Sequence, residues 1–295
     1  MDDFRGIGVA MITPFTAMGE VDYNALEALI EQYIQSGIDF LVVQGTTAET
    51  VTLTKQEKEN LAQRVVDINA GRLPLMLGKG GNNTNALVND LKTSNLSGYS
   101  AILSVCPYYN RPNQEGIFQH FSAVAEASPL PVMLYNVPAR TGASIENATV
   151  IRLAGANKNI FGIKDATGDM NSGKALIEAS PDDFLVTSGD DLTALDLVTR
   201  GGVGAISVIA GAFPTKFSEM IQLGSQDDLT IPRTIEKELL PFIDLIFKEG
   251  NPTGLKALMS LQGKCDNVLR LPLVAATDSL FDEIKCQFDA LTTKC

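Results

Sequence analysis

Short apolar runs alternate along the chain with longer segments of helical periodicity, repeating every roughly 25 to 30 residues as βα units do. Eight runs have the length and composition of buried parallel strands: 8–12, 40–43, 74–77, 101–105, 132–135, 160–163, 184–186 and 205–208. No Gly-x-Gly-x-x-Gly motif follows the first run, which disfavours a dinucleotide-binding sheet. The pattern predicts an α/β fold in which the strands close into a (β/α)₈ TIM barrel.

Helical signals fill the intervals between the runs. Thr54 followed by Glu57 indicates a capping box, and Gly71 stands where that helix should end. Asp190 or Asp191 is expected to cap the helix that ends near Gly201. Another interval has five apolar residues on one helical face: Leu26, Leu29, Ile30, Tyr33 and Ile34.

Three further helical segments follow the eighth unit, at 231–247, 253–261 and 278–291. No low-complexity stretch or long linker divides the chain. We therefore expect a catalytic barrel over 1–225 and a C-terminal helical region over 226–295 that packs on it.

Composition narrows the classes of function. The formal charge of −12 disfavours nucleic acid and anionic membrane surfaces as partners, since both require a basic patch. No run of about 18 apolar residues suggests a membrane span. The chain begins MDDFRGIG, without the basic start of a secretory signal, so a cytoplasmic location is expected.

Cysteine and histidine usage disfavours a metal mechanism. Cys106, Cys265, Cys286 and Cys295 have no CxxC spacing and are expected to be reduced thiols. His120 is the only histidine, whereas zinc-dependent aldolases and hydrolases usually need several. We expect no metal, and a surface or packing role for His120.

Lys164 is the strongest chemical signal. Catalytic groups of barrel enzymes gather at the C-terminal ends of the strands, and Lys164 directly follows the run 160–163. Burial of an amine favours its neutral form, which attacks a ketone to give an iminium. The alternative is a lysine that reaches solvent from the strand end or pairs with Asp165.

Hydroxyl groups follow other strands and offer a proton relay in a site without histidine. Tyr135, Tyr109 and Thr46 are expected to face one cavity, although any single tyrosine is more readily a residue at the edge of the core, with its hydroxyl hydrogen-bonded. Arg140 is suited to bidentate contact with a carboxylate, or is a surface arginine.

Five short motifs occur in register along the chain: GTTAE at 45–49, PYYNRPNQEG at 107–116, YNVPARTG at 135–142, GIKDATG at 162–168 and SGDD at 188–191. With them the chain resembles the dihydrodipicolinate synthase family of pyruvate-dependent Schiff-base aldolases. The resemblance extends from the Thr13-Pro14-Phe15 turn to the segment 270–273.

The resemblance implies that Lys164 forms a Schiff base with pyruvate and needs no external cofactor. Tyr135 would donate and accept protons in a relay with Thr46 and Tyr109, the latter inserted from the neighbouring subunit of a tight dimer. The enamine would attack aspartate semialdehyde in lysine and diaminopimelate biosynthesis. The family usually forms tetramers of two tight dimers.

The same resemblance implies the substrate-binding residues. Thr47 would hold the pyruvate carboxylate, the backbone of Ile206 would border the pyruvate site, and Arg140 would receive the carboxylate of aspartate semialdehyde. Ala48 stands where the family commonly has Gly, which is awkward if this position needs a positive φ.

The positions that correspond to the family's lysine-inhibition site depart from the pattern. Lys55, Lys58 and Ala86 replace its histidines and acid, whereas Asn82 and Tyr108 are retained. Two cations facing a cationic effector predict weak or absent inhibition by lysine.

Two rival functions remain at the level of sequence. Another aldolase of the superfamily, acting on a 2-keto-3-deoxy sugar acid or N-acetylneuraminate, shares the lysine and the tyrosine. Arg140 and the motif at 107–116 favour the synthase. A non-catalytic keto-acid binder would have little reason to retain amine, hydroxyls and arginine together.

Overall fold

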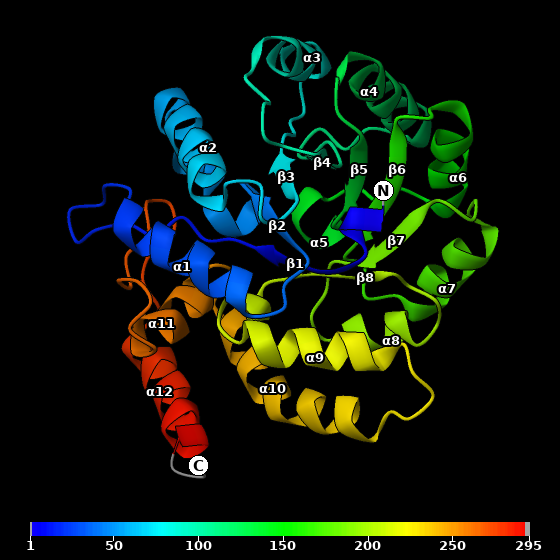
Figure 1. The fold of residues 1–295 in the computed structure, drawn as a ribbon. Coiled ribbons are helices and arrows are strands. Elements are labelled where there is room, and N and C mark those ends of the chain that lie inside the picture. Colours follow the sequence, from blue (N-terminus) through cyan, green and yellow to red (C-terminus); the bar gives the residue numbers. More distant parts are fainter. Residues whose placement is uncertain (1, 293–295) are drawn as a thin grey trace.

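Eight parallel strands close into a barrel in sequential order, in a computed structural model that describes residues 2–292 (Figure 1). The strands are β1 Gly6–Ala10, β2 Phe40–Val43, β3 Leu75–Gly78, β4 Ala101–Val105, β5 Val132–Asn136, β6 Ile160–Asp165, β7 Leu185–Ser188 and β8 Gly204–Ser207. The predicted TIM barrel is confirmed, and no predicted strand boundary is displaced by more than two residues.

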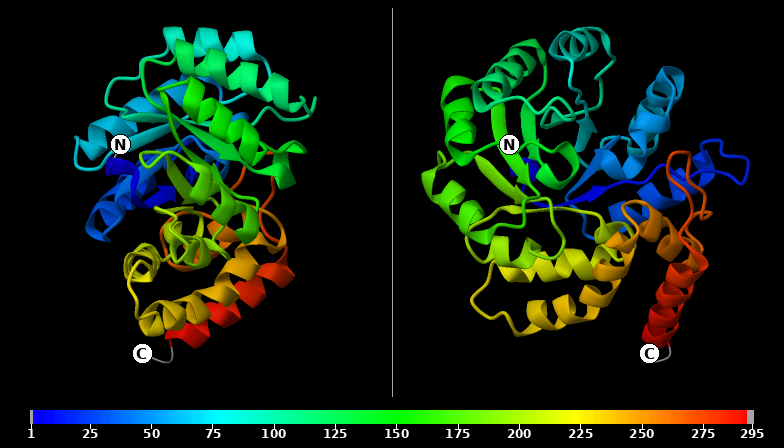
Figure 2. Two further views of the ribbon diagram at one scale, coloured as in Figure 1. Left: turned by 90° about the vertical axis from the view of Figure 1, so that its right-hand side faces the viewer. Right: turned by 180° about the vertical axis from the view of Figure 1, so that it is seen from behind.

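Helices surround the barrel and continue beyond it (Figure 1). Those before the eighth strand are α1 Tyr23–Gln35, α2 Lys55–Asn69, α3 Thr84–Thr93, α4 Gln114–Ala127, α5 Pro138–Thr141, α6 Asn147–Ala156, α7 Met170–Ala179 and α8 Ala194–Val198. Those after it are α9 Pro214–Gly224, α10 Thr230–Lys248, α11 Thr253–Leu261 and α12 Asp278–Thr292. The last three confirm the predicted C-terminal helices, and α12 lies beside α10 (Figure 2).

The barrel interior is packed with side chains, as expected for eight strands. Phe4 closes one end, with its ring 5.3 Å from that of Phe40. The interior cluster also contains Met76, Met133 and Tyr135. The barrel interior is thus a packed core.

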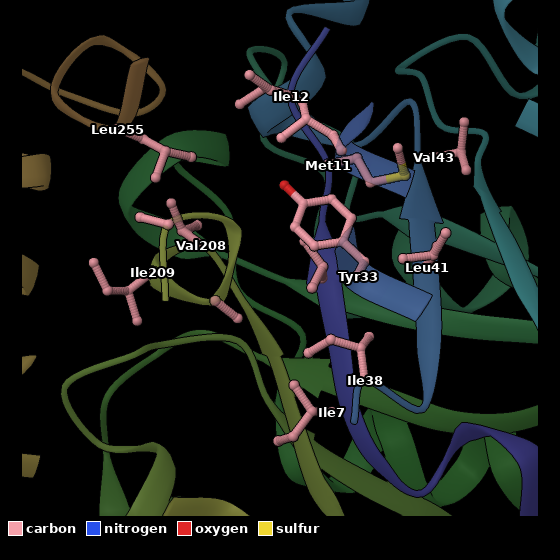
Figure 3. Close-up of a cluster of buried hydrophobic side chains, with 14 of the residues drawn as sticks. Ile7, Met11, Ile12, Tyr33, Ile38, Leu41, Val43, Val208, Ile209 and Leu255 are labelled. Carbon is pink, nitrogen blue, oxygen red and sulfur yellow. The ribbon is translucent and has the colours of Figure 1, made fainter. Parts of the chain in front are cut away.

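A larger apolar cluster joins the barrel to the C-terminal helices. It runs from Ile7 in β1 to Leu255 in α11 and Ile284 in α12. Figure 3 shows part of it, with Tyr33 lying among residues of the first two strands. The hydroxyl of Tyr33 donates to the carbonyl of Gly211, 3.3 Å away. The C-terminal helices therefore share one continuous core with the barrel.

One of the two predicted helix caps is present in the structure. Thr54 and Glu57 form the predicted capping box of α2, which ends at Ala70 immediately before Gly71. The capping role for Asp190 or Asp191 was wrong: Thr193 occupies the N-cap of α8, without a side-chain cap. The two acids are engaged elsewhere.

His120 and Cys106 are buried, whereas Cys265 is partly buried and Cys286 is exposed. His120 is 5% exposed, with its Nδ1 2.9 Å from the hydroxyl of Thr84. Burial lowers the pKa of His120 to about 4 and raises the pKa of the Cys106 thiol to about 11. Cys106, Cys265 and Cys286 are free thiols, and Cys295 lies outside the described residues.

Residues 2–292 contain no helix both long and apolar enough to span a membrane. Nor do they contain a group of three or more His, Cys, Asp or Glu side chains placed to hold a metal ion.

A buried ion pair joins α11 to the segment after β2. The Nζ of Lys256 lies 2.5 Å from Oε1 of Glu49, and both side chains are fully buried. Lys256 also donates to the carbonyl of Val268, and the N–H of Arg270 donates to Oε2 of Glu49. Burial lowers the pKa of Lys256, while the Glu49 carboxylate opposes that shift. Both carboxylate oxygens of Glu49 thus have a hydrogen-bond partner.

We predict that Glu49→Gln destabilises the protein strongly. Removing one partner of a buried pair leaves an uncompensated charge, which costs about 3–5 kcal/mol. Glu115→Gln is the matched control, because its pair with Arg152 is about half exposed on both sides. Urea denaturation of the two variants measures the difference, and equal losses of stability would contradict the prediction.

We predict that the protein loses stability as the pH falls, because His120 takes up a proton more readily in the unfolded state. Its folded pKa of about 4 lies below the unfolded value near 6.5, so the unfolded state binds the proton first. The stability of the wild type relative to His120→Asn should fall by about 3 kcal/mol between pH 7 and 4. Titration of Asp191, whose pKa is raised to about 6, changes the stability of both proteins by the same amount. Urea denaturation across this range tests it, and a difference constant with pH counts against it.

Candidate active site

Lys164 lies near the C-terminal end of β6, where the ladder pairs it with Tyr135 of β5 and Thr187 of β7. Its side chain is only 5% exposed, and Nζ lies 4.4 Å from the centroid of the Tyr135 ring. This geometry follows from the strand register, because paired residues of neighbouring strands point to the same face. The alternative of a solvated lysine is wrong.

The pairing of Lys164 with Asp165 is also wrong. Successive residues of a strand face opposite sides, and Asp165 accepts from the hydroxyl of Thr167 at 2.9 Å and from the amide of Asn136. Among residues 2–292 no carboxylate lies within ion-pair distance of Lys164. Gly189 makes room for the amine's stem, since a Cβ there would lie 2.8 Å from both Cγ and Cε of Lys164.

A cavity of about 360 Å³ surrounds this amine. Its polar lining includes Lys164, Tyr135, Thr46, Thr47 and Arg140, so the structure brings five of the predicted residues together. Thr46, Tyr135 and Arg140 also line a wider cleft of about 980 Å³ that runs between α2 and α3. The cavity thus opens outward past Arg140, an exposed residue of α5.

The segment after β2 forms one wall of the cavity. Thr46 and Thr47 begin a 3₁₀ helix, Thr46–Ala48, whose first N–H groups have no acceptor within the helix. The hydroxyl of Thr47 accepts from Nδ2 of Asn251 at 3.0 Å. Ala48 does not have a positive φ; Gln44 and Glu49 do, at 58° and 51°. The substitution of Ala at this position therefore introduces no left-handed strain.

Tyr109 is not part of this cavity within one chain. Its side chain is 89% exposed, and its backbone is left-handed with a φ of 76°. The expectation that it faces the same cavity as Tyr135 and Thr46 is wrong for a single chain. The loop around it is held by Asn82, whose amide donates to the carbonyl of Tyr108, and by Arg111, which donates to Gly142.

Ile206 belongs to the interior core of the barrel, in β8 beside Gly8 of β1. It is 1% exposed, and the cavity lining contains Val208 two residues further along the chain.

Asp191 is a site residue whose role the sequence did not reveal. It is 5% exposed and accepts from the N–H of Ile209 at 2.8 Å and of Val208 at 3.1 Å. Burial raises its pKa to about 6, against hydrogen bonds from Ser207 and Ile209 and the charge of Lys164. Asp191 thereby fixes the segment that carries Val208 into the cavity lining.

Asn251 was also missed. It lies in the loop between α10 and α11, 204 residues from its partner Thr47, and it lines the cavity. No local pattern identifies such a contact.

The assembled groups suit the chemistry of a small keto acid. A buried primary amine is the nucleophile that forms an imine, and a phenol beside it can transfer protons. Free N–H groups and a hydroxyl at Thr46 and Thr47 suit an anionic oxygen. Arg140 at the mouth suits a second carboxylate.

The chain is similar to known proteins over nearly its whole length. The model of the dihydrodipicolinate synthetase family matches residues 3–291. The 4-hydroxy-tetrahydrodipicolinate synthase of Flavobacterium psychrophilum is 48% identical, over 96% of this chain and 97% of the relative. That of Phocaeicola vulgatus is 45% identical, over 99% and 98%.

Solved structures share the fold at lower sequence identity. The dihydrodipicolinate synthase of Aquifex aeolicus has a TM-score of 0.94 at 34% identity, over 98% of both chains. The chloride-inhibited enzyme of Acinetobacter baumannii, complexed with pyruvate, has a TM-score of 0.93 at 38% identity, over 97% of this chain and 98% of that one. The resemblance predicted from the five motifs is confirmed, and the chain belongs to the dihydrodipicolinate synthetase family.

Proposed function

We propose that this protein condenses pyruvate with L-aspartate 4-semialdehyde to 4-hydroxy-tetrahydrodipicolinate, a step of lysine and diaminopimelate biosynthesis in the cytoplasm. The single observation that carries the proposal is the buried amine of Lys164, beside the Tyr135 ring and free of any ion-paired carboxylate in the described chain. The names of the relatives select this reaction over the sugar-acid aldolases.

Lys164 supplies the covalent step. Its amine attacks C2 of pyruvate, and loss of water gives the imine. A proton then leaves C3, and the resulting enamine carbon forms a bond to the aldehyde carbon of the second substrate. The amino group of that substrate attacks C2, which closes the ring and releases the amine of Lys164. Tyr135, whose ring centroid lies 4.4 Å from Nζ of Lys164, carries the protons of these steps.

The substrate carboxylates take separate places. Thr47, at the inner wall, holds the carboxylate of pyruvate, and the backbone near Ile206 borders the same substrate. Arg140 lies where the cavity meets the outer cleft and receives the carboxylate of the semialdehyde. This order of residues from the inside outward matches the order in which the two substrates react, pyruvate first with Lys164 and the semialdehyde then with the enamine.

A second copy of the chain completes the relay. Tyr109 is 89% exposed in a left-handed conformation, and Val51 and Tyr108 are also exposed on the rim of the outer cleft. An exposed apolar surface of this kind favours association. Tyr109 enters the cavity of the partner, joining Thr46 and Tyr135 there, in a tetramer made of two tight dimers.

We predict that sodium borohydride traps pyruvate on Lys164. Wild-type protein should gain the mass of one reduced pyruvate adduct per chain, because hydride reduction converts the imine into a secondary amine that does not hydrolyse. Lys164→Ala should gain none. Lys58→Ala, which removes a lysine of the outer cleft, is the control and should be labelled like wild type. Mass spectrometry measures the adduct, and labelling that persists in Lys164→Ala would reject the proposal.

We predict weak or absent inhibition by free lysine. Lys55 and Lys58 line the outer cleft, and the Nζ of Lys55 is only loosely paired with Glu59 at 3.8 Å. A cationic effector meets like charge there and no acid at Ala86, which is exposed at the start of α3. Titration of lysine into a steady-state assay measures this. Ala86→Glu should strengthen inhibition, and strong inhibition of the wild type below millimolar lysine would disprove the prediction.

A further inference from the structure

We infer that Asn251 is a positioning residue: it fixes the direction of the Thr47 hydroxyl so that its proton points at the carboxylate of the keto acid. The inference rests on the proposed function, which gives Thr47 that carboxylate. It adds a role for the C-terminal segment in substrate recognition.

The hydrogen bond between the two side chains sets the direction. Asn251 Nδ2 is a donor only, so at 3.0 Å the oxygen of Thr47 is the acceptor. A hydroxyl has one proton and two acceptor sites. The proton of Thr47 is therefore left for another acceptor, and residues 2–292 supply none for it.

Burial restricts where that proton can go. Thr47 is 2% exposed and Asn251 7% exposed, so neither side chain is free to exchange its partner for bulk water. Both side chains line the cavity that contains Lys164. The remaining donor direction of the Thr47 hydroxyl is thus into the cavity, where an anionic oxygen satisfies it.

The chain holds Asn251 in place from both sides. Lys256, one turn into α11, pairs with Glu49, two residues after Thr47. Helices α10 and α11 pack closely beside the loop that carries Asn251, since a Cβ at Gly254 would lie only 2.6 Å from the backbone of Ile246. The segments 251–256 and 47–49 are therefore joined by two side-chain contacts in parallel.

The predicted consequence is a selective loss of affinity for pyruvate. In Asn251→Ala the Thr47 hydroxyl rotates freely, and KM for pyruvate should rise about tenfold, the scale of a hydrogen bond to a charged group. In Asn251→Asp the new carboxylate accepts the Thr47 proton and repels the substrate anion, so KM should rise further. KM for aspartate semialdehyde and kcat should change much less in both.

A double-mutant cycle with Thr47→Val tests the mechanism. If Asn251 acts through the hydroxyl, Asn251→Ala should not raise KM for pyruvate further in the Thr47→Val background. A purely structural role predicts that the two effects multiply, and that result would overturn the inference. So would a lower KM in Asn251→Asp than in Asn251→Ala.

Borohydride trapping at graded pyruvate concentrations provides a second readout that needs no aldehyde. Half-maximal labelling should shift in Asn251→Asp, which has the shape of the native side chain and carries the test if Asn251→Ala does not fold. Wild-type protein that traps no pyruvate would defeat the proposed function itself. Normal trapping in the wild type with an additive cycle would defeat only the inference about Asn251.

Discussion

The arrangement of the site depends on one buried ion pair, between Glu49 and Lys256. Such a pair adds little net stability, because desolvation of the two charges offsets their attraction, but breaking it is costly. Here it ties a residue with a φ of 51° to a helix more than 200 residues away. Thr46 and Thr47 lie three and two residues before Glu49. The position of the cavity wall is therefore set by the C-terminal segment, which is a structural part of the site.

The two buried lysines, Lys256 and Lys164, differ in whether a carboxylate lies beside the amine, and this difference determines which of them is suited to chemistry. Lys256 is fully buried and has a carboxylate at 2.5 Å, so its ammonium is held as a fixed charge. Lys164 is 5% exposed and has no carboxylate at ion-pair distance within residues 2–292. Asp165 points away from it, and Asp191 is occupied by two backbone N–H groups. The barrel thus keeps its acids engaged elsewhere and leaves one amine available as a nucleophile.

Sequence reasoning succeeded where the relevant physics is local or periodic. Strand positions follow from apolar runs, and the neighbourhood of Lys164, Tyr135 and Thr46 follows from strand ends meeting at one rim. The first strand was placed two residues late because Met11 and Ile12 beyond it are also buried in the core. The capping role predicted for Asp191 is wrong because its carboxylate accepts from the backbone N–H of Ile209, a tertiary contact that a local sequence pattern does not indicate. The hydrogen-bond partner of Thr47, Asn251, lies 204 residues away, and no periodic pattern relates the two positions.

The loop that carries Tyr109 has a fixed backbone conformation within one chain, although the Tyr109 side chain is exposed. Tyr109 and Arg111 both have positive φ, at 76° and 49°, and such conformations persist only where surrounding contacts enforce them. Those contacts come from the same chain, through Asn82 and the carbonyl of Gly142. The loop is thus shaped before any partner arrives, which lowers the entropy lost on association. If Tyr109 completes the relay of a second copy, proton transfer at each Lys164 depends on a neighbour's loop whose conformation is already fixed.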